Sequence, residues 1–304
     1  MKRNLSRVKK LLKSLLNVEK YIEETVKFEL LKQDYDKCLL NNIEKNILNY
    51  EENKESQIIV SLTTYSKRIY SVYLTIESLF RQTIKPNKII LWLAEDEYKN
   101  IPCLLKILQD KGLEIRFCKD IKSYKKLIPT LKKYPNDIII TVDDDIIYPI
   151  DFIENLYKEY LDDQNCIYYY IGHKIKIENN KIMPYSSWAF DYQGEEKTYL
   201  TLPTGVGGVL YPPNIFSPEV FNEELFIKLA PNADDLWFKA MTLKNGIKCK
   251  KIKINEEFYK KFIQIKSGQD IALYLKNLVQ NENDRQLKNI FDYYGLWDDL
   301  KESD

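Results

Sequence analysis

The chain of 304 residues is poor in histidine, in paired cysteines and in long hydrophobic runs. Its one histidine, His173, excludes histidine-rich metal sites. The five cysteines are scattered and form no Cys-x-x-Cys pair, which gives no sign of a zinc cage and suits a reducing, cytoplasmic location. No run of about 18 apolar residues occurs, so the sequence predicts no membrane-spanning helix.

Net charge is nearly absent as well. Lys and Arg number 46 against 45 Asp and Glu, which gives a formal net charge of +1 and argues against nucleic acid as a partner. The hydrophobic share of 44% and the charged share of 30% are those of a globular protein, which excludes a disordered chain. With so little histidine, any chemistry of this protein must rest mainly on carboxylates.

Short β-branched runs alternate with helical patterns in the middle of the chain. Strands are predicted at residues 57–63, 88–93, 113–117 and 137–142, and helices at about 69–81, 104–111, 125–133 and 234–243. This alternation predicts an α/β fold with a mostly parallel central sheet flanked by helices. Ligands of such sheets bind beyond the carboxyl ends of the strands.

Composition divides the chain into three predicted parts: an N-terminal helical extension (1–55), the α/β domain (56–258) and a C-terminal helical region (259–304), in which a helix is predicted over about 270–300. Within residues 1–20, leucines recur at helical spacing and basic residues fill the remainder. This amphipathic helix fits either peripheral contact with an anionic membrane or packing on the domain or on a partner chain, including a homo-oligomer.

Three consecutive carboxylates, Asp143, Asp144 and Asp145, follow the most apolar predicted strand. If strand alternation continues, Asp143 and Asp145 point to one side and Asp144 to the other. Two carboxylates on one side suit Mg²⁺ or Mn²⁺, which keep water and phosphate oxygens as their other ligands. The alternative is a solvated loop whose aspartates cap the helix near Phe152.

Two classes of enzyme place acidic residues at such a position. In phosphatases of the haloacid-dehalogenase type, an apolar strand near the start of the domain ends in Asp-x-Asp. Here Ile147 occupies the place where that motif has Thr or Val, and three predicted strands precede the cluster. In nucleotide-sugar glycosyltransferases of the GT-A type, the Asp-x-Asp follows a central strand in mid-chain.

Residues 57–254 resemble a GT-A-type glycosyltransferase related to family 2, of the kind that builds bacterial surface glycans. The segments that carry the resemblance are 59–65 with Arg68, 123–129, 142–145, 204–208 and 232–237. The resemblance implies a GT-A-like fold and a metal-dependent hexosyltransferase that uses Mn²⁺ or Mg²⁺. It implies transfer of a sugar from a nucleotide-sugar donor, a UDP-sugar, to a glycan or lipid-linked acceptor in lipopolysaccharide or capsule biosynthesis, with inversion.

The resemblance also assigns roles to individual residues. Its donor-binding positions are Thr63, Thr64, Arg68, Asp96, Lys126, Asp143, Asp144 and Gly207. Its metal ligands are Asp143 and Asp145, and its catalytic pair is Asp235 as general base with Asp234. Apart from the resemblance, Trp188 and Trp237 are candidate acceptor contacts, because their rings can stack on sugar faces. A like-charged neighbour and partial burial would raise the pKa of Asp235 toward a value useful for a base.

Plainer alternatives exist for these residues. A surface ion pair would account for Arg68, a solvated turn for Asp96 and a solvated helix face for Lys126. N-capping would account for Asp234. Core packing would account for both tryptophans. For the whole protein, the alternatives are the metal-dependent phosphatase and a non-catalytic carbohydrate-binding scaffold, although a scaffold has no physical need for so many carboxylates.

Overall fold

The computed structural model describes residues 2–40, 48, 56–97, 100–179, 181–267 and 282–300, and of residues 2–17 it describes the backbone. Part of the predicted N-terminal extension, and the first half of the helix predicted over 270–300, lie outside the described residues. The second half of that helix is present as α10 (Glu282–Tyr294).

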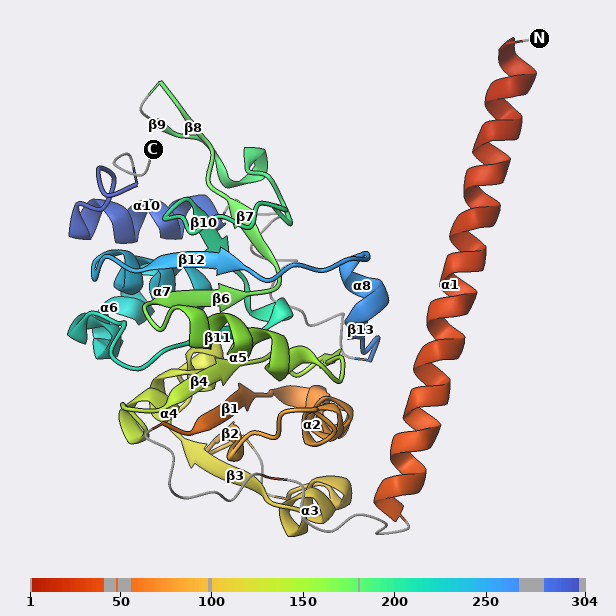
Figure 1. The fold of residues 1–304 in the computed structure, drawn as a ribbon, viewed down its shortest axis with the longest axis horizontal. Coiled ribbons are helices and arrows are strands. Elements are labelled where there is room, and N and C mark those ends of the chain that lie inside the picture. Colours follow the sequence, from red (N-terminus) through yellow and green to blue (C-terminus); the bar gives the residue numbers. More distant parts are fainter. Residues whose placement is uncertain are drawn as a thin grey trace.

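A seven-stranded sheet forms the centre of the domain, in the order β12-β6-β11-β4-β1-β2-β3 (Figure 1). Its strands are β1 (Ile58–Thr63), β2 (Lys88–Ala94), β3 (Leu113–Cys118), β4 (Ile138–Thr141), β6 (Cys166–Tyr169), β11 (Val209–Tyr211) and β12 (Lys248–Lys251). Strands β1 to β4 form parallel pairs, β12 is parallel to β6, and β11 runs antiparallel between β4 and β6. The predicted α/β class and mostly parallel sheet are confirmed.

Three short two-stranded ladders accompany the main sheet. They are β10 (Thr201–Pro203) with β7 (Gly172–Lys174), β13 (Ile263–Gln264) with β5 (Ile146–Ile147), and β8 (Ile177–Glu178) with β9 (Lys181–Ile182). The second of these ladders fixes the turn that follows β4, because the backbone N–H of Ile265 donates to the carbonyl of Asp145 at 2.7 Å. Residues 263–265 therefore pack directly against the acidic turn.

Helices cover both faces of the sheet (Figure 1). The α-helices are α1 (Lys2–Leu40), α2 (Val72–Phe80), α3 (Cys103–Asp110), α4 (Ile128–Lys133), α5 (Phe152–Asp162), α6 (Glu223–Leu229), α7 (Asp234–Leu243) and α8 (Phe258–Lys261), besides α10. Each of the helices predicted at 69–81 and 125–133 is divided into a 3-10 turn followed by an α-helix. The two 3-10 turns are Ser66–Tyr70, before α2, and Lys122–Lys126, before α4. The second division precedes Pro129, which is favoured in the first turn of a helix.

Burial on both faces of the sheet explains why strands such as β4 consist of continuous apolar runs. In β4, Ile138 and Ile140 belong to the core shared with α2, α3 and α5, and Ile139 belongs to the opposite core shared with α4, α6, α7 and α10. Successive side chains of a strand point to opposite faces, so a strand covered twice needs apolar residues at every position.

The long helix α1 stands beside the domain (Figure 1). Its C-terminal part docks through Tyr35 and Leu39, which are buried in the core. The Tyr73 hydroxyl donates to Asp36 Oδ1 at 2.7 Å, and Lys20 Nζ forms an ion pair with Glu257 Oε2 at 2.7 Å. Within the described part of the chain, none of the helices combines the length and apolar character that a bilayer crossing requires.

Candidate active site

The acidic cluster forms a turn at the carboxyl end of β4. The predicted alternation of Asp143 and Asp145 against Asp144 is wrong, because the strand ends at Thr141 and Asp144 and Asp145 occupy a turn into β5. Side chains alternate only while the extended ladder continues. The alternative of helix capping is also wrong, since Asp151 holds the N-cap position of α5.

Arg68 binds the last two carboxylates of the acidic turn, Asp144 and Asp145. Its Nη1 donates to Asp144 Oδ1 at 2.7 Å, and its Nη2 lies 3.1 Å from Asp145 Oδ2. The Thr64 hydroxyl donates to Asp144 Oδ2 at 2.5 Å. All three charged side chains are buried, so the alternative of a surface ion pair for Arg68 is wrong. Burial raises the pKa of Asp144 to about 6, with Asp145 acting in the same direction and Arg68 and Thr64 opposing it.

Lys126 contacts the first carboxylate of the turn, Asp143, and also the two aspartates that open α7. Its Nζ lies 3.0 Å from Asp234 Oδ2, 3.4 Å from Asp143 Oδ1 and 3.6 Å from Asp235 Oδ1. The lysine is buried rather than solvated. Burial lowers the pKa of Lys126, but the three carboxylates outweigh it and hold the pKa well above its usual range, so the ammonium stays charged.

Asp234 and Asp235 open α7 in two different environments. Asp234 is buried and accepts a hydrogen bond from the Ser123 hydroxyl at 2.7 Å, and the N-cap position belongs to Ala233. The side chain of Asp235 is 27% exposed, and its Oδ2 accepts a hydrogen bond from the backbone N–H of Gly205 at 3.2 Å.

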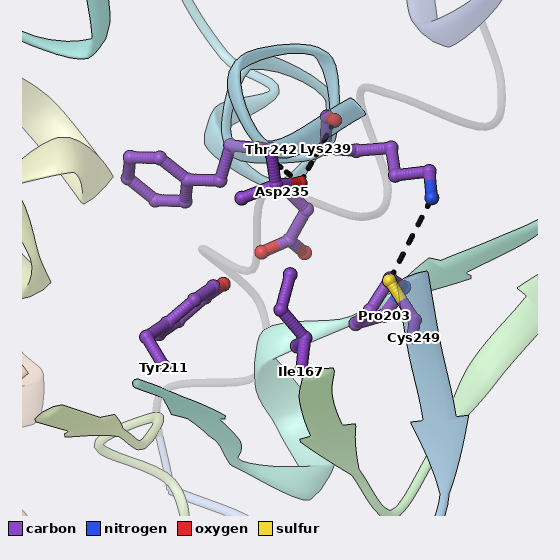
Figure 2. A pocket seen from close by; sticks show the side chains of 8 residues that line it. Ile167, Pro203, Tyr211, Asp235, Lys239, Thr242 and Cys249 are labelled. Carbon is purple, nitrogen blue, oxygen red and sulfur yellow. Dashed lines mark hydrogen bonds between the residues drawn. The ribbon is translucent and has the colours of Figure 1, made fainter. Parts of the chain in front are cut away.

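The pKa of Asp235 is raised to about 7. Burial is the main cause, Lys126 opposes it, and the nearby charges of Asp234 and Asp143 add to it. Figure 2 shows the carboxylate of Asp235 directed from α7 into a cavity between Tyr211 and Ile167. The cavity measures about 10 Å³, close to the least volume that holds a water molecule.

The glycine-rich turn at Gly205–Gly207 lies against these carboxylates. A Cβ on Gly205 would overlap Lys126 Nζ and lie 2.8 Å from Asp143 Oδ1, so a larger residue here would displace the ends of these two side chains. A Cβ on Gly207 would lie 2.6 Å from Ile171 Cγ2. Gly207 therefore packs closely on Ile171, and its predicted contact with the donor stays a prediction.

The remaining predicted donor residues lie at the same edge of the sheet. The Thr63 hydroxyl donates to the carbonyl of Trp92 at 2.8 Å and so ties the ends of β1 and β2 together. Asp96 is exposed in the turn that follows β2. Its neighbour Glu97 accepts a hydrogen bond from the backbone of Ser66, two residues before Arg68.

The predicted acceptor contacts are corrected by the structure. Trp188 and Trp237 are both buried. Their indole N–H groups donate to the carbonyls of Met183 at 2.8 Å and Val220 at 3.2 Å, respectively. Neither ring offers an exposed face on which a sugar could stack, so core packing is the explanation for both residues.

Tyr148 is a site residue that the sequence did not reveal. Its buried hydroxyl accepts from the backbone N–H of Asp143 at 3.0 Å and donates to the carbonyl of Val206 at 3.3 Å. It therefore connects the acidic turn to the glycine turn. Its position three residues beyond the acidic cluster was the only available signal.

Asp143 and Asp145 could supply only part of the coordination shell of a divalent ion. Among the described residues, no group of three or more His, Cys, Asp or Glu side chains is placed to hold a metal. Asp143 and Asp145 are both hard oxygen donors, but their surroundings differ. The side chain of Asp143 is 32% exposed, whereas Asp145 is buried and its Oδ2 lies 3.1 Å from Arg68 Nη2. Mg²⁺ is commonly bound by one or two carboxylates together with water and substrate phosphates. Asp143 and Asp145 supply oxygen donors of the kind that arrangement uses, and Asp143 is the one open to solvent.

Comparison with known proteins gives structural similarities alone. No family model and no curated protein sequence matches the chain. The mannosyltransferase PcManGT from Pyrobaculum calidifontis, in complex with GDP-Man and Mn²⁺, superposes with a TM-score of 0.45 and 12% identity, over 89% of this chain and 78% of that one. TarS 1–349 from S. aureus, in complex with UDP, gives 0.43 and 14% identity over 66% and 58%, respectively.

A third similar structure is the inositol-1-phosphate CTP transferase from T. maritima, with a TM-score of 0.42 and 11% identity over 76% of this chain and 98% of that one. At these scores and identities, the similarities carry no weight for the function of this chain. Its function has to be inferred from the geometry of the site.

Proposed function

We propose that this protein is a metal-dependent glycosyltransferase that moves a hexose from a UDP-sugar to a hydroxyl of a glycan or lipid-linked acceptor, in the biosynthesis of a surface polysaccharide. The observation that carries the proposal is the connection of Asp235 to the acidic turn through Lys126. Residues far apart in sequence form one charged cluster at the carboxyl end of β4. This edge is where α/β sheets bind ligands.

Asp235 is the proposed general base. Glycosyl transfer requires removal of a proton from the acceptor hydroxyl as it attacks the sugar. A carboxylate with a pKa of about 7 is both available at neutral pH and basic enough to accept that proton. The hydrogen bond from Gly205 fixes Oδ2. We propose that the base acts on the face of the sugar opposite the diphosphate, which implies inversion.

The donor site is proposed at the acidic turn. Asp143 and Asp145 would hold Mn²⁺ or Mg²⁺, which supplies positive charge to the leaving diphosphate. Arg68 and Thr64 orient the turn from the end of β1 through their contacts with Asp144. Asp143, whose side chain is 32% exposed, would be the ligand nearest to solvent.

The alternatives make different demands on this cluster. A phosphatase of the haloacid-dehalogenase type would use Asp143 as a nucleophile. Its motif stands near the start of the domain, whereas β1, β2 and β3 precede Asp143 in this chain. A carbohydrate-binding scaffold would have no need to hold three carboxylates around one buried ammonium, because removing charges from water is costly.

Donor hydrolysis tests the proposed reaction without an acceptor. With Mn²⁺ and a panel of UDP-sugars, we expect slow release of UDP from one donor, with water in place of the acceptor. Proton NMR at early times should show the released sugar with inverted anomeric configuration. Retention would remove Asp235 from the role of base. Release of phosphate from simple phosphomonoesters, with every UDP-sugar left intact, would favour the phosphatase.

A further inference from the structure

Helix α1 has a second apolar face, on the side away from the domain. Tyr35 and Leu39 dock on the core. In contrast, Ile22, Val26 and Leu30 are 55%, 51% and 61% exposed. Successive residues of an α-helix are about 100° apart around the axis. At that spacing, these three residues lie on the side of α1 opposite Tyr35 and Leu39.

The exposed residues continue a row toward the N-terminus. Positions 15, 12, 8 and 5 are all Leu or Val and follow in steps of three and four residues. We call Leu5, Val8, Leu12, Leu15, Ile22, Val26 and Leu30 the outer row. From Leu5 to Val26 the row extends about 32 Å along the helix. A spacing of three and four residues over three heptads is the pattern of a two-stranded coiled coil.

Charge is distributed unevenly along the same helix. Residues 2–17 contain six basic and no acidic residues, whereas residues 18–36 contain six acidic and three basic ones. A parallel partner would set like charges side by side and place Glu19, which interrupts the row, opposite its own copy. An antiparallel partner sets the basic half against the acidic half and places Leu12 opposite Ile22, and Val8 opposite Val26.

We propose that the outer row binds the outer row of a second copy of this chain, so that two α1 helices form an antiparallel coiled coil with an α/β domain on each outer side. The alternative occupant is an anionic membrane. Glu19 and Glu23 stand on the side of the outer row and would be repelled by anionic lipid, whereas the basic half of a second α1 would attract them. The observations therefore favour the second copy. This inference does not depend on the proposed enzymatic function.

The mass of the full-length protein tests this proposal directly. Light scattering after size-exclusion chromatography should give the mass of two chains for the wild type and of one chain for the Ile22→Glu/Val26→Glu variant. Both substituted side chains are exposed, so the fold should be unaffected. The matched control is Leu161→Glu on α5, where the leucine is 55% exposed, and it should remain a dimer. A wild type with the mass of one chain, or a double variant that stays dimeric, overturns the proposal.

Cross-linking tests the antiparallel orientation. Val8→Cys and Val26→Cys are made separately, with Cys38 and Cys103 replaced by serine. After subunit exchange and mild oxidation, the mixture should form a disulfide between the two kinds of chain, and neither protein alone should do so. Cross-linking of Val26→Cys to itself would indicate a parallel pair and contradict the proposed arrangement.

Vesicles test the membrane alternative. The wild type is mixed with vesicles of phosphatidylcholine and phosphatidylglycerol and then floated on a density gradient. We expect the dimer to remain at the bottom of the gradient, apart from the vesicles, because its outer rows are covered. If the wild type is a single chain and floats with the vesicles, and the Ile22→Glu/Val26→Glu variant does not float, the outer row binds lipid. That result would overturn the proposed self-association.

Discussion

Replacement of Asp235 by asparagine is expected to lower kcat for glycosyl transfer by about 10²- to 10⁴-fold, the range that a general base contributes. Asparagine keeps the size of the side chain and can still accept the hydrogen bond from Gly205, but it cannot take up the proton. Binding of the donor should be retained, because the proposed metal ligands are unchanged. Steady-state kinetics together with donor titration would separate these two effects.

The pH profile sharpens this first prediction. Because burial raises the pKa of Asp235 to about 7 and a base acts only when deprotonated, kcat/KM of the wild type should rise with pH and level off above about 7. In Asp235→Asn this rising limb should disappear, and in Asp235→Glu it should persist. Full activity of Asp235→Asn with an unchanged profile would show that another group removes the proton.

Replacement of Lys126 by methionine should have the second large effect. Its buried ammonium balances Asp143, Asp234 and Asp235. Removing one partner of a buried ion pair leaves an uncompensated charge and typically costs about 3–5 kcal/mol. We therefore expect a loss of that size in the free energy of unfolding, measured by urea denaturation.

Lys126→Met should also alter catalysis in a defined direction. Lys126 opposes the rise in the pKa of Asp235, so without it that pKa increases and the rising limb of kcat/KM moves to higher pH. The matched control is Lys125→Met, because Lys125 is equally buried but pairs with the exposed Asp120. If Lys126→Met has the same free energy of unfolding and the same pH profile of kcat/KM as Lys125→Met, Lys126 does not connect the acidic turn to Asp235.

Much of the fold could be predicted from the sequence because it depends on local patterns. Runs such as Ile138–Thr141 are apolar at nearly every position, as a strand buried on both faces requires. Clustered charge in the sequence also singles out Asp143–Asp145 and Asp234–Asp235, and the structure connects Asp143 to Asp234 and Asp235 through Lys126. The directions of the aspartate side chains could not be predicted, because they depend on where the β4 ladder ends.

The role of Lys126 could not be predicted for a related reason. A lysine in a basic stretch usually faces water, and its burial here results from packing between a 3-10 turn, the glycine turn and α7. The same limit applies to Trp188 and Trp237. A sequence pattern identifies tryptophans on a site-bearing segment, but only the packed structure tells which face of the ring is covered.

Calorimetric titration of the UDP-sugar selected by donor hydrolysis is the most direct test of the central claim, that the acidic turn binds a diphosphate through a divalent ion. In Mn²⁺ the wild type and Asp235→Asn should both bind the donor. EDTA should abolish that binding, and Asp145→Asn should weaken it severely. Equal affinity with and without the ion, or an Asp145→Asn variant that binds as tightly as the wild type, would contradict the claim.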